Sequence, residues 1–197
     1  MIIALIGDLH GYPASALSFL ERTKPDFAIQ VGDFYCYDVA WPVPLHWIPG
    51  NHENEKVLAA IVSGEWGQPK NSHLCRGGEI MDLGGAKVVA LPSVPRRIYG
   101  PAPAEIARAS FERCLGLEGE IDIFFSHGCG FEFTVPVRNQ FRNVEDPEIT
   151  FLLRKMRPRI AVSGHNHWYW REECEGIDCI RLGRCDGEGN GWATVEV

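Results

Sequence analysis

The 197-residue sequence contains no apolar run near the length of about 20 residues that a membrane-spanning helix needs. It also shows no basic leader, and the short apolar run within Met1 to Asp8 predicts a first strand instead of a signal peptide. We therefore expect no membrane partner and a cytoplasmic location.

Positive charge is scarce as well. The 19 Lys and Arg residues face 26 Asp and Glu residues, which gives a formal net charge of -7. This balance argues against broad binding to nucleic acid or to an anionic membrane, so no extended nucleic-acid partner is expected. A small anionic substrate stays compatible with the charge, because a bound metal can reverse the local field.

The seven cysteines do not show the spacing of a zinc knuckle. An odd number of cysteines without a secretory leader favours a reducing, cytoplasmic setting. Cys174, Cys179 and Cys185 lie close in sequence, and we expect them to be buried in a hairpin instead of holding a structural metal.

The composition is that of an ordinary globular protein, with 45% apolar and 23% charged residues. No internal repeat, low-complexity segment or linker interrupts the chain. Its length suits one domain over residues 1–197, with a sizeable core.

Apolar, β-branched strands alternate with amphipathic helices at both ends of the chain, which predicts parallel βαβ layers. The predicted strands cover residues 2–6, 27–31, 45–48, 121–125 and 160–162, and the predicted helices cover 13–22, 55–62, 104–115 and 146–156.

Between these layers, glycine pairs separate short apolar runs and predict an antiparallel meander that forms a second sheet. Its predicted strands cover residues 73–76, 79–83 and 87–91. Residues 129–145 are predicted to be a loop, and the tail is predicted to form hairpin strands over 168–174, 177–182 and 192–197.

Polar residues follow five of the predicted strands. They are Asp8 and His10, Asp33, Asn51 and His52, His127, and His165 and His167. The carboxyl ends of parallel strands lie along one sheet edge, so these side chains can converge. Their oxygen and imidazole donors suit Mn²⁺, Fe or Zn²⁺ better than Mg²⁺ or Ca²⁺. These residues offer more ligand atoms than one ion needs. Their number fits two ions that share a bridging carboxylate.

Several of these residues also have simpler interpretations when taken alone. Asp8 can cap a helix or turn, and His127 can be a hydrogen-bonded core histidine. Gly50 allows a tight turn before Asn51. Glu53 either orients His52 or caps the next helix, and Cys129 is either near the site or a passive thiol. The histidines that fit none of the clusters, and are expected on the surface or on a sheet face, are His46 and His73.

In chain order the motifs are Asp8-Leu9-His10, Gly32-Asp33, Gly50-Asn51-His52-Glu53, His127 and Gly164-His165-Asn166-His167. This ordered set resembles the calcineurin-like metallophosphoesterases, from residue 8 to residue 167. The resemblance implies a four-layer α/β/β/α sandwich of two mixed sheets flanked by helices.

The resemblance also implies the role of each residue. One metal would be held by Asp8, His10, Asp33 and His167, and the other by Asp33, Asn51, His127 and His165, so that Asp33 bridges them. The implied ions are two divalent transition metals, with Mn²⁺ favoured over Fe, Zn or Ni. His52 is the implied catalytic histidine, which assists the leaving group when a metal-bridging hydroxide attacks phosphorus.

The implied activity is that of a metal-dependent phosphoesterase, a hydrolase acting on a small phosphomonoester, phosphodiester or nucleotide. Residues 50–53, 87–91 and 121–127 are also similar to RNA lariat debranching enzymes, although that group usually has cysteine in place of His10. The motifs are compatible with a nucleotide phosphodiesterase too, and less well with a non-catalytic protein-binding scaffold of the same fold.

Loop residues supply candidates for substrate binding. Arginine forks match phosphate oxygens, and the candidates are Arg96, Arg97, Arg138 and Arg142, although the simpler interpretation of each is a solvated surface residue. Aromatic residues that follow the ligand strands either stack on a base or ring or pack beneath the loops, and they are Tyr12, Phe34, Tyr35 and Tyr37.

Overall fold

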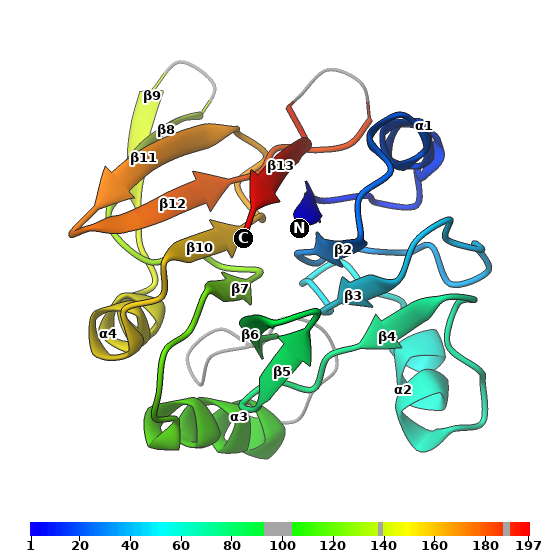
Figure 1. Ribbon diagram of the computed structural model, residues 1–197, viewed down its shortest axis with the longest axis horizontal. Helices are drawn as coiled ribbons and strands as arrows, with labels where there is room; N and C mark the ends of the chain where they lie inside the picture. Colours follow the sequence, from blue (N-terminus) through cyan, green and yellow to red (C-terminus); the bar gives the residue numbers. More distant parts are fainter. Residues whose placement is uncertain (93–103, 138–139, 187–189) are drawn as a thin grey trace.

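The computed structural model describes residues 1–92, 104–137, 140–186 and 190–197, and it contains two facing sheets with helices on their outer sides (Figure 1). The first sheet has the order β13-β1-β2-β3-β4. Its strands are β1 (Ile2–Ile6), β2 (Phe27–Gln30), β3 (Leu45–Trp47), β4 (Ser72–Leu74) and β13 (Trp192–Glu196). The strands β1 to β4 are parallel, and β13 pairs antiparallel with β1.

The second sheet has the order β11-β12-β10-β7-β6-β5. Its strands are β5 (Ile80–Leu83), β6 (Ala86–Leu91), β7 (Ile123–Ser126), β10 (Ile160–Ser163), β11 (Trp170–Cys174) and β12 (Ile177–Arg181). The four central strands are parallel, whereas the edge strands β5 and β11 are antiparallel to their neighbours. Both sheets are therefore mixed.

Each sheet is buried on both faces, which explains the continuous apolar runs of the sequence. In β1, Ile3 and Leu5 pack between the two sheets, whereas Ala4 and Ile6 pack toward the helices on the outer face. The helices α1 (Ala14–Thr23) and α2 (Glu55–Ser63) cover the first sheet, and α3 (Ala104–Gly116) and α4 (Pro147–Met156) cover the second (Figure 1). The predicted α/β/β/α sandwich is confirmed.

The predicted antiparallel meander is partly wrong. Strands β5 and β6 do form an antiparallel pair of the second sheet, but β4 belongs to the first sheet and is parallel to β3. Leu74 of β4 packs in the core beneath α1 and α2, so the burial of this side chain favours the position of β4 in the first sheet. The glycines at 77 and 78 thus lie in a connection between the two sheets and not in a hairpin turn.

The predicted loop over residues 129–145 contains a hairpin instead. Strands β8 (Phe133–Val137) and β9 (Gln140–Val144) pair antiparallel. Phe133 packs against Cys129 and Val144, and the Arg181 guanidinium lies 4.1 Å from the centre of the Phe133 ring. Phe133, Val135 and Val137 alternate along β8 as in a strand, but Pro136 interrupts this run and weakens the signal, and the Arg181 contact comes from a distant residue.

The seven cysteines are all free thiols, and Cys174 and Cys179 lie in the β11–β12 hairpin as expected. Cys185 is buried beyond β12, where its thiol donates to the Gly191 carbonyl at 3.1 Å.

Among the described residues, none of the helices has the length and apolar character to cross a bilayer.

His46 and His73 lie opposite each other on β3 and β4, with ring centroids 5.6 Å apart, which confirms their expected place on a sheet face. The His46 ring also contacts Phe27, and its Nδ1 has no hydrogen-bond partner among the described residues. Burial, and secondarily the nearby His73, lowers the pKa of His46 to about 4. The folded protein therefore holds His46 neutral.

We expect a His46→Phe variant to lose less unfolding free energy than the wild-type protein when the pH falls from 6.5 to about 4. In this window an unfolded His46 takes up a proton and a folded one does not, so acid favours the unfolded wild-type chain. Urea unfolding of chelator-treated protein at several pH values measures the difference. Equal pH slopes for the two proteins would contradict the assignment.

Candidate metal centre

The polar residues predicted from the sequence follow neighbouring parallel strands. Asp8 and His10 follow β1, Asp33 follows β2, and Asn51 and His52 follow β3, all in the first sheet. His127 follows β7 and the pair His165 and His167 follows β10 in the second sheet, where these strands are also neighbours. The two sheets therefore present their ligand candidates at the same edge of the sandwich.

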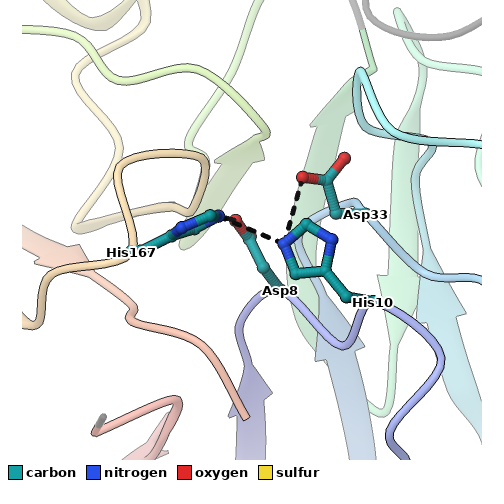
Figure 2. Close-up of side chains that lie close together, drawn as sticks. All are labelled: Asp8, His10, Asp33 and His167. Atoms are coloured by element: carbon teal, nitrogen blue, oxygen red, sulfur yellow. Dashed lines mark hydrogen bonds and ion pairs between the residues drawn. The ribbon is translucent and has the colours of Figure 1, made fainter. Parts of the chain in front are cut away.

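The first cluster consists of Asp8, His10, Asp33 and His167, with one possible ligand atom of each within 4.8 Å of all the others (Figure 2). The Nε2 atoms of His10 and His167 are 3.1 Å apart. His167 Nε2 is also 3.1 Å from Asp8 Oδ2, and His10 Nε2 is 3.6 Å from Asp33 Oδ2. This is a compact set of two carboxylates and two imidazoles.

A second cluster lies on the other side of Asp33. Asn51 Oδ1 is 2.9 Å from His127 Nε2 and 2.8 Å from His165 Nδ1. The other carboxylate oxygen of the shared aspartate, Asp33 Oδ1, is 3.5 Å from His127 Nε2. The structure thus brings together all seven residues predicted as metal ligands, in two groups that meet at Asp33.

The donor atoms in both groups suit a cation. His127 Nδ1 lies 2.8 Å from the Val31 carbonyl oxygen, which only accepts, so Nδ1 carries the proton and a neutral ring turns its Nε2 lone pair toward Asn51 and Asp33. Asp33 Oδ2 is buried and has no hydrogen-bond partner among the described residues. Facing lone pairs and a partnerless buried carboxylate oxygen are the arrangement that a bound metal ion stabilises.

The protonation state of His10 also suits a bound metal ion. Burial lowers the pKa of His10 below its usual value, and the carboxylates of Asp33 and Asp8 only partly offset this effect. His10 is therefore held neutral near pH 7, the state in which an imidazole binds a metal ion.

Two motif glycines are required by close packing against the carboxylates. A Cβ atom on Gly50 would lie 2.2 Å from Asp33 Oδ1, and one on Gly164 would lie 2.3 Å from Asp8 Oδ1. Gly50 does not have the positive φ of a left-handed turn, so it is needed for this close approach and not for the turn that the sequence suggested.

The backbone of the site is strained at several ligands. His10, Asp33, His165 and His167 all have φ between 47° and 68°, a region that non-glycine residues seldom adopt. Each such residue costs about 1–3 kcal/mol, and such strain gathers at functional sites. The chain therefore gives up stability to turn these side chains toward one another.

His52 lies beside the first cluster. Its ring centroid is 5.7 Å from that of His10, and its side chain is exposed. The backbone N–H of His52 donates to Asp33 Oδ1 at 2.8 Å. Asp33 thus positions the residue predicted to assist the leaving group.

Glu53 has a role that differs from both sequence interpretations. The helix cap is Asn54, whose Oδ1 accepts from the Val57 N–H at 3.2 Å. The buried Glu53 carboxylate instead accepts from three backbone N–H groups and one hydroxyl, and these belong to Phe34, Tyr35, Gly50 and Tyr37. Burial raises the pKa of Glu53, and these donors partly oppose that shift. Glu53 joins the loop after β2 to the loop after β3.

The candidates for substrate binding divide into three groups. Arg96, Arg97 and Arg138 lie outside the described residues, as does the side chain of Arg142. Phe34 is buried and stacks on Trp47 with ring centroids 4.4 Å apart, and the Tyr37 hydroxyl is bound by Glu53, so both pack beneath the loops. Tyr12 and Tyr35 are exposed.

Cys129 is buried and accepts from the Asn166 side-chain amide at 3.6 Å. Asn166 lies between His165 and His167 in the sequence, so its hydrogen bond to Cys129 helps to hold the turn that carries both histidines.

The sequence model of a family described as calcineurin-like phosphoesterase matches residues 1–181. No curated protein matches the chain. Similar solved structures include the phosphopantetheinyl hydrolase PptH of Mycobacterium tuberculosis, with 13% identity, a TM-score of 0.56, and coverage of 98% of this chain and 95% of that one. A novel archaeal phosphodiesterase is 11% identical, with a TM-score of 0.52 and coverage of 100% of both chains.

Another similar structure is GAP50, described as the anchor in the inner membrane complex of Plasmodium. It is 11% identical, with a TM-score of 0.64 and coverage of 98% of this chain and 80% of that one. At such low identities these three likenesses show the shared fold.

We expect Glu53→Ala to lower the unfolding free energy by about 3 kcal/mol, because it leaves several buried donors without an acceptor. Tyr37→Phe removes only one of these donors and should lower it by about 1 kcal/mol. Urea unfolding of chelator-treated protein measures both values without a contribution from bound metal. Equal losses for the two variants would show that Glu53 does not join the two loops.

Proposed function

This chain belongs to the calcineurin-like phosphoesterase family, and we propose that it hydrolyses a small phosphate ester with two divalent metal ions. The first ion would be held by Asp8, His10, Asp33 and His167, and the second by Asp33, Asn51, His127 and His165.

The Asp33 carboxylate is the observation that carries this proposal. One of its oxygens faces His10 at 3.6 Å, and the other faces His127 at 3.5 Å. A carboxylate with one oxygen toward each group of ligands is suited to bridge two ions. A site for one ion, bound by the first group, would not explain why Asn51, His127 and His165 gather at the same edge.

When bound, the ions would supply positive charge for the phosphate oxygens and activate a water molecule for attack at phosphorus. The residues of the chain would hold and orient this centre. His52 would donate a proton to the leaving oxygen from its exposed position beside His10, with its backbone held by Asp33.

The donor set favours a transition metal over Mg²⁺ or Ca²⁺, because four of the seven ligands are imidazoles. We propose Mn²⁺ first, and Fe, Zn²⁺ or Ni²⁺ after it. The ions would also make the site attractive to a phosphate ester although the chain has a net charge of -7.

Metal analysis combined with hydrolysis assays tests the proposal. We expect purified protein supplied with Mn²⁺ to hold about two ions per chain. It should hydrolyse p-nitrophenyl phosphate or bis(p-nitrophenyl) phosphate, and Asp33→Asn should reduce both metal content and activity. A chain that takes up no metal and hydrolyses neither ester would instead be a non-catalytic scaffold, a role consistent with the name of the similar anchor protein GAP50.

Asn51 and His52 are adjacent, but we expect their variants to behave differently. His52→Ala should lower kcat by about 10²–10⁴ and leave the metal content intact, because it removes only a proton donor. Asn51→Asp should change the affinity for metal and for phosphate, because it adds a negative charge to the second ligand group.

Elemental analysis and steady-state kinetics of both variants measure this division. His73→Ala is the matched control, since His73 is exposed on β4 and lies outside both ligand groups. Equal metal loss in the Asn51 and His52 variants would refute the separate roles.

A further inference from the structure

Tyr35 is an exposed aromatic residue held in an unfavourable backbone conformation next to the ligand groups. It follows Asp33 by two positions, has φ of 53°, and leaves 42% of its surface exposed. A bulky residue rarely adopts this conformation unless its surroundings impose it. Here the Tyr35 N–H donates to the buried Glu53 carboxylate at 3.4 Å, so a specific contact holds the strained backbone.

The position of Tyr35 relative to the proposed proton donor follows from its neighbours. A Cβ atom placed on Gly11, the residue after His10, would lie 3.5 Å from Tyr35 Cβ. The centroids of the Tyr35 and Tyr37 rings are 6.1 Å apart, and the Tyr37 hydroxyl accepts from the Asn54 N–H at 3.2 Å. Tyr35 is thus close to the residue that follows His10, and its ring contacts Tyr37, which binds the backbone two residues after His52.

Tyr12 is a second exposed aromatic residue, and its loop is next to the loop that carries Tyr35. The Gly11 N–H donates to the Phe34 carbonyl at 3.3 Å, so the loop of residues 9–12 runs alongside the loop that carries Tyr35. Tyr12 closes the turn of this loop by donating its N–H to the Leu9 carbonyl, and its side chain is 62% exposed. Two exposed rings on adjacent loops can bind a flat group by stacking.

The geometry points to a phosphate ester whose released alcohol carries a flat ring, such as a nucleoside, with Tyr35 as the residue that stacks on the ring. This inference rests on the proposed phosphoesterase activity, because it assigns the flat ring to the alcohol that the proposed hydrolysis releases. Phe34 and Tyr37 are occupied by packing and by Glu53, so they do not compete for this role.

Two matched pairs of esters test the inference. Adenosine 5′-monophosphate and ribose 5-phosphate release the same kind of alcohol and differ only in the base, as do their methyl diesters. We expect kcat/KM to be roughly tenfold or more higher for the adenosine member of the hydrolysed pair, as one base–aromatic stack predicts. Tyr35→Gly should bring this ratio close to one, mainly through KM, and Tyr35→Phe should retain it because the ring remains.

Glycine accepts the positive φ of residue 35 without strain, so Tyr35→Gly should remove the ring without destabilising the folded protein. Trp66→Ala is the control, since Trp66 is an exposed aromatic at the far end of α2. Binding of the two phosphonate analogues, in which a CH₂ group replaces the bridging oxygen, should show the same ratios by calorimetry.

A ratio near one in the wild-type protein, or a ratio that Tyr35→Gly leaves unchanged, would overturn the stacking role while hydrolysis itself stands. If none of these esters nor a p-nitrophenyl ester is hydrolysed, the proposed function fails. Equal binding of the two phosphonates would then overturn the inference as well.

Discussion

Two carboxylates, Asp8 and Asp33, are fully buried where the first two strands end, and the rest of the site depends on how their negative charges are stabilised. An isolated buried carboxylate is strongly unfavourable unless hydrogen bonds or a counter-charge compensate. The Asp8 carboxylate accepts from the backbone N–H of His165, and the Asp33 carboxylate accepts from that of His52. Each aspartate thereby binds the backbone of another motif, and the remaining lone pairs face imidazoles and a proposed cation.

This requirement also explains the unusual local backbone. Carboxylate, amide and imidazole atoms approach one another here because glycines leave room and because four of the seven ligand residues adopt positive φ. Glu53 contributes by binding the loop after β2 to the loop after β3, which sets the position of Asp33 relative to His52. The strain at the ligands is therefore balanced by hydrogen bonds between loops that are distant in sequence.

Much of the fold was predictable because strands buried on both faces leave an unambiguous apolar run, and the runs before Asp8, Asp33 and His127 are of this kind. The β4 strand was not predictable, since its placement depends on packing partners far along the chain. The β8–β9 hairpin was missed although apolar residues alternate at 133, 135 and 137, because Pro136 weakens the strand signal of this run. Leu74 is buried beneath helices of the first sheet, and Phe133 packs against Val144 and Arg181. A run as short as β4, in which Leu74 is the one apolar residue, contains no signal for such a contact.

The sequence by itself determined which residue types stand at the end of each strand, and their order was enough to indicate the family and the chemistry. Only the tertiary structure decided that Asp33 faces both ligand groups, that Glu53 binds two loops instead of capping a helix, and that Tyr35 is exposed while Phe34 is buried. The physical reason is that residue type and strand order are local properties of the chain. Which atoms share a buried volume depends on how two sheets pack, and no neighbouring residue in the sequence specifies that.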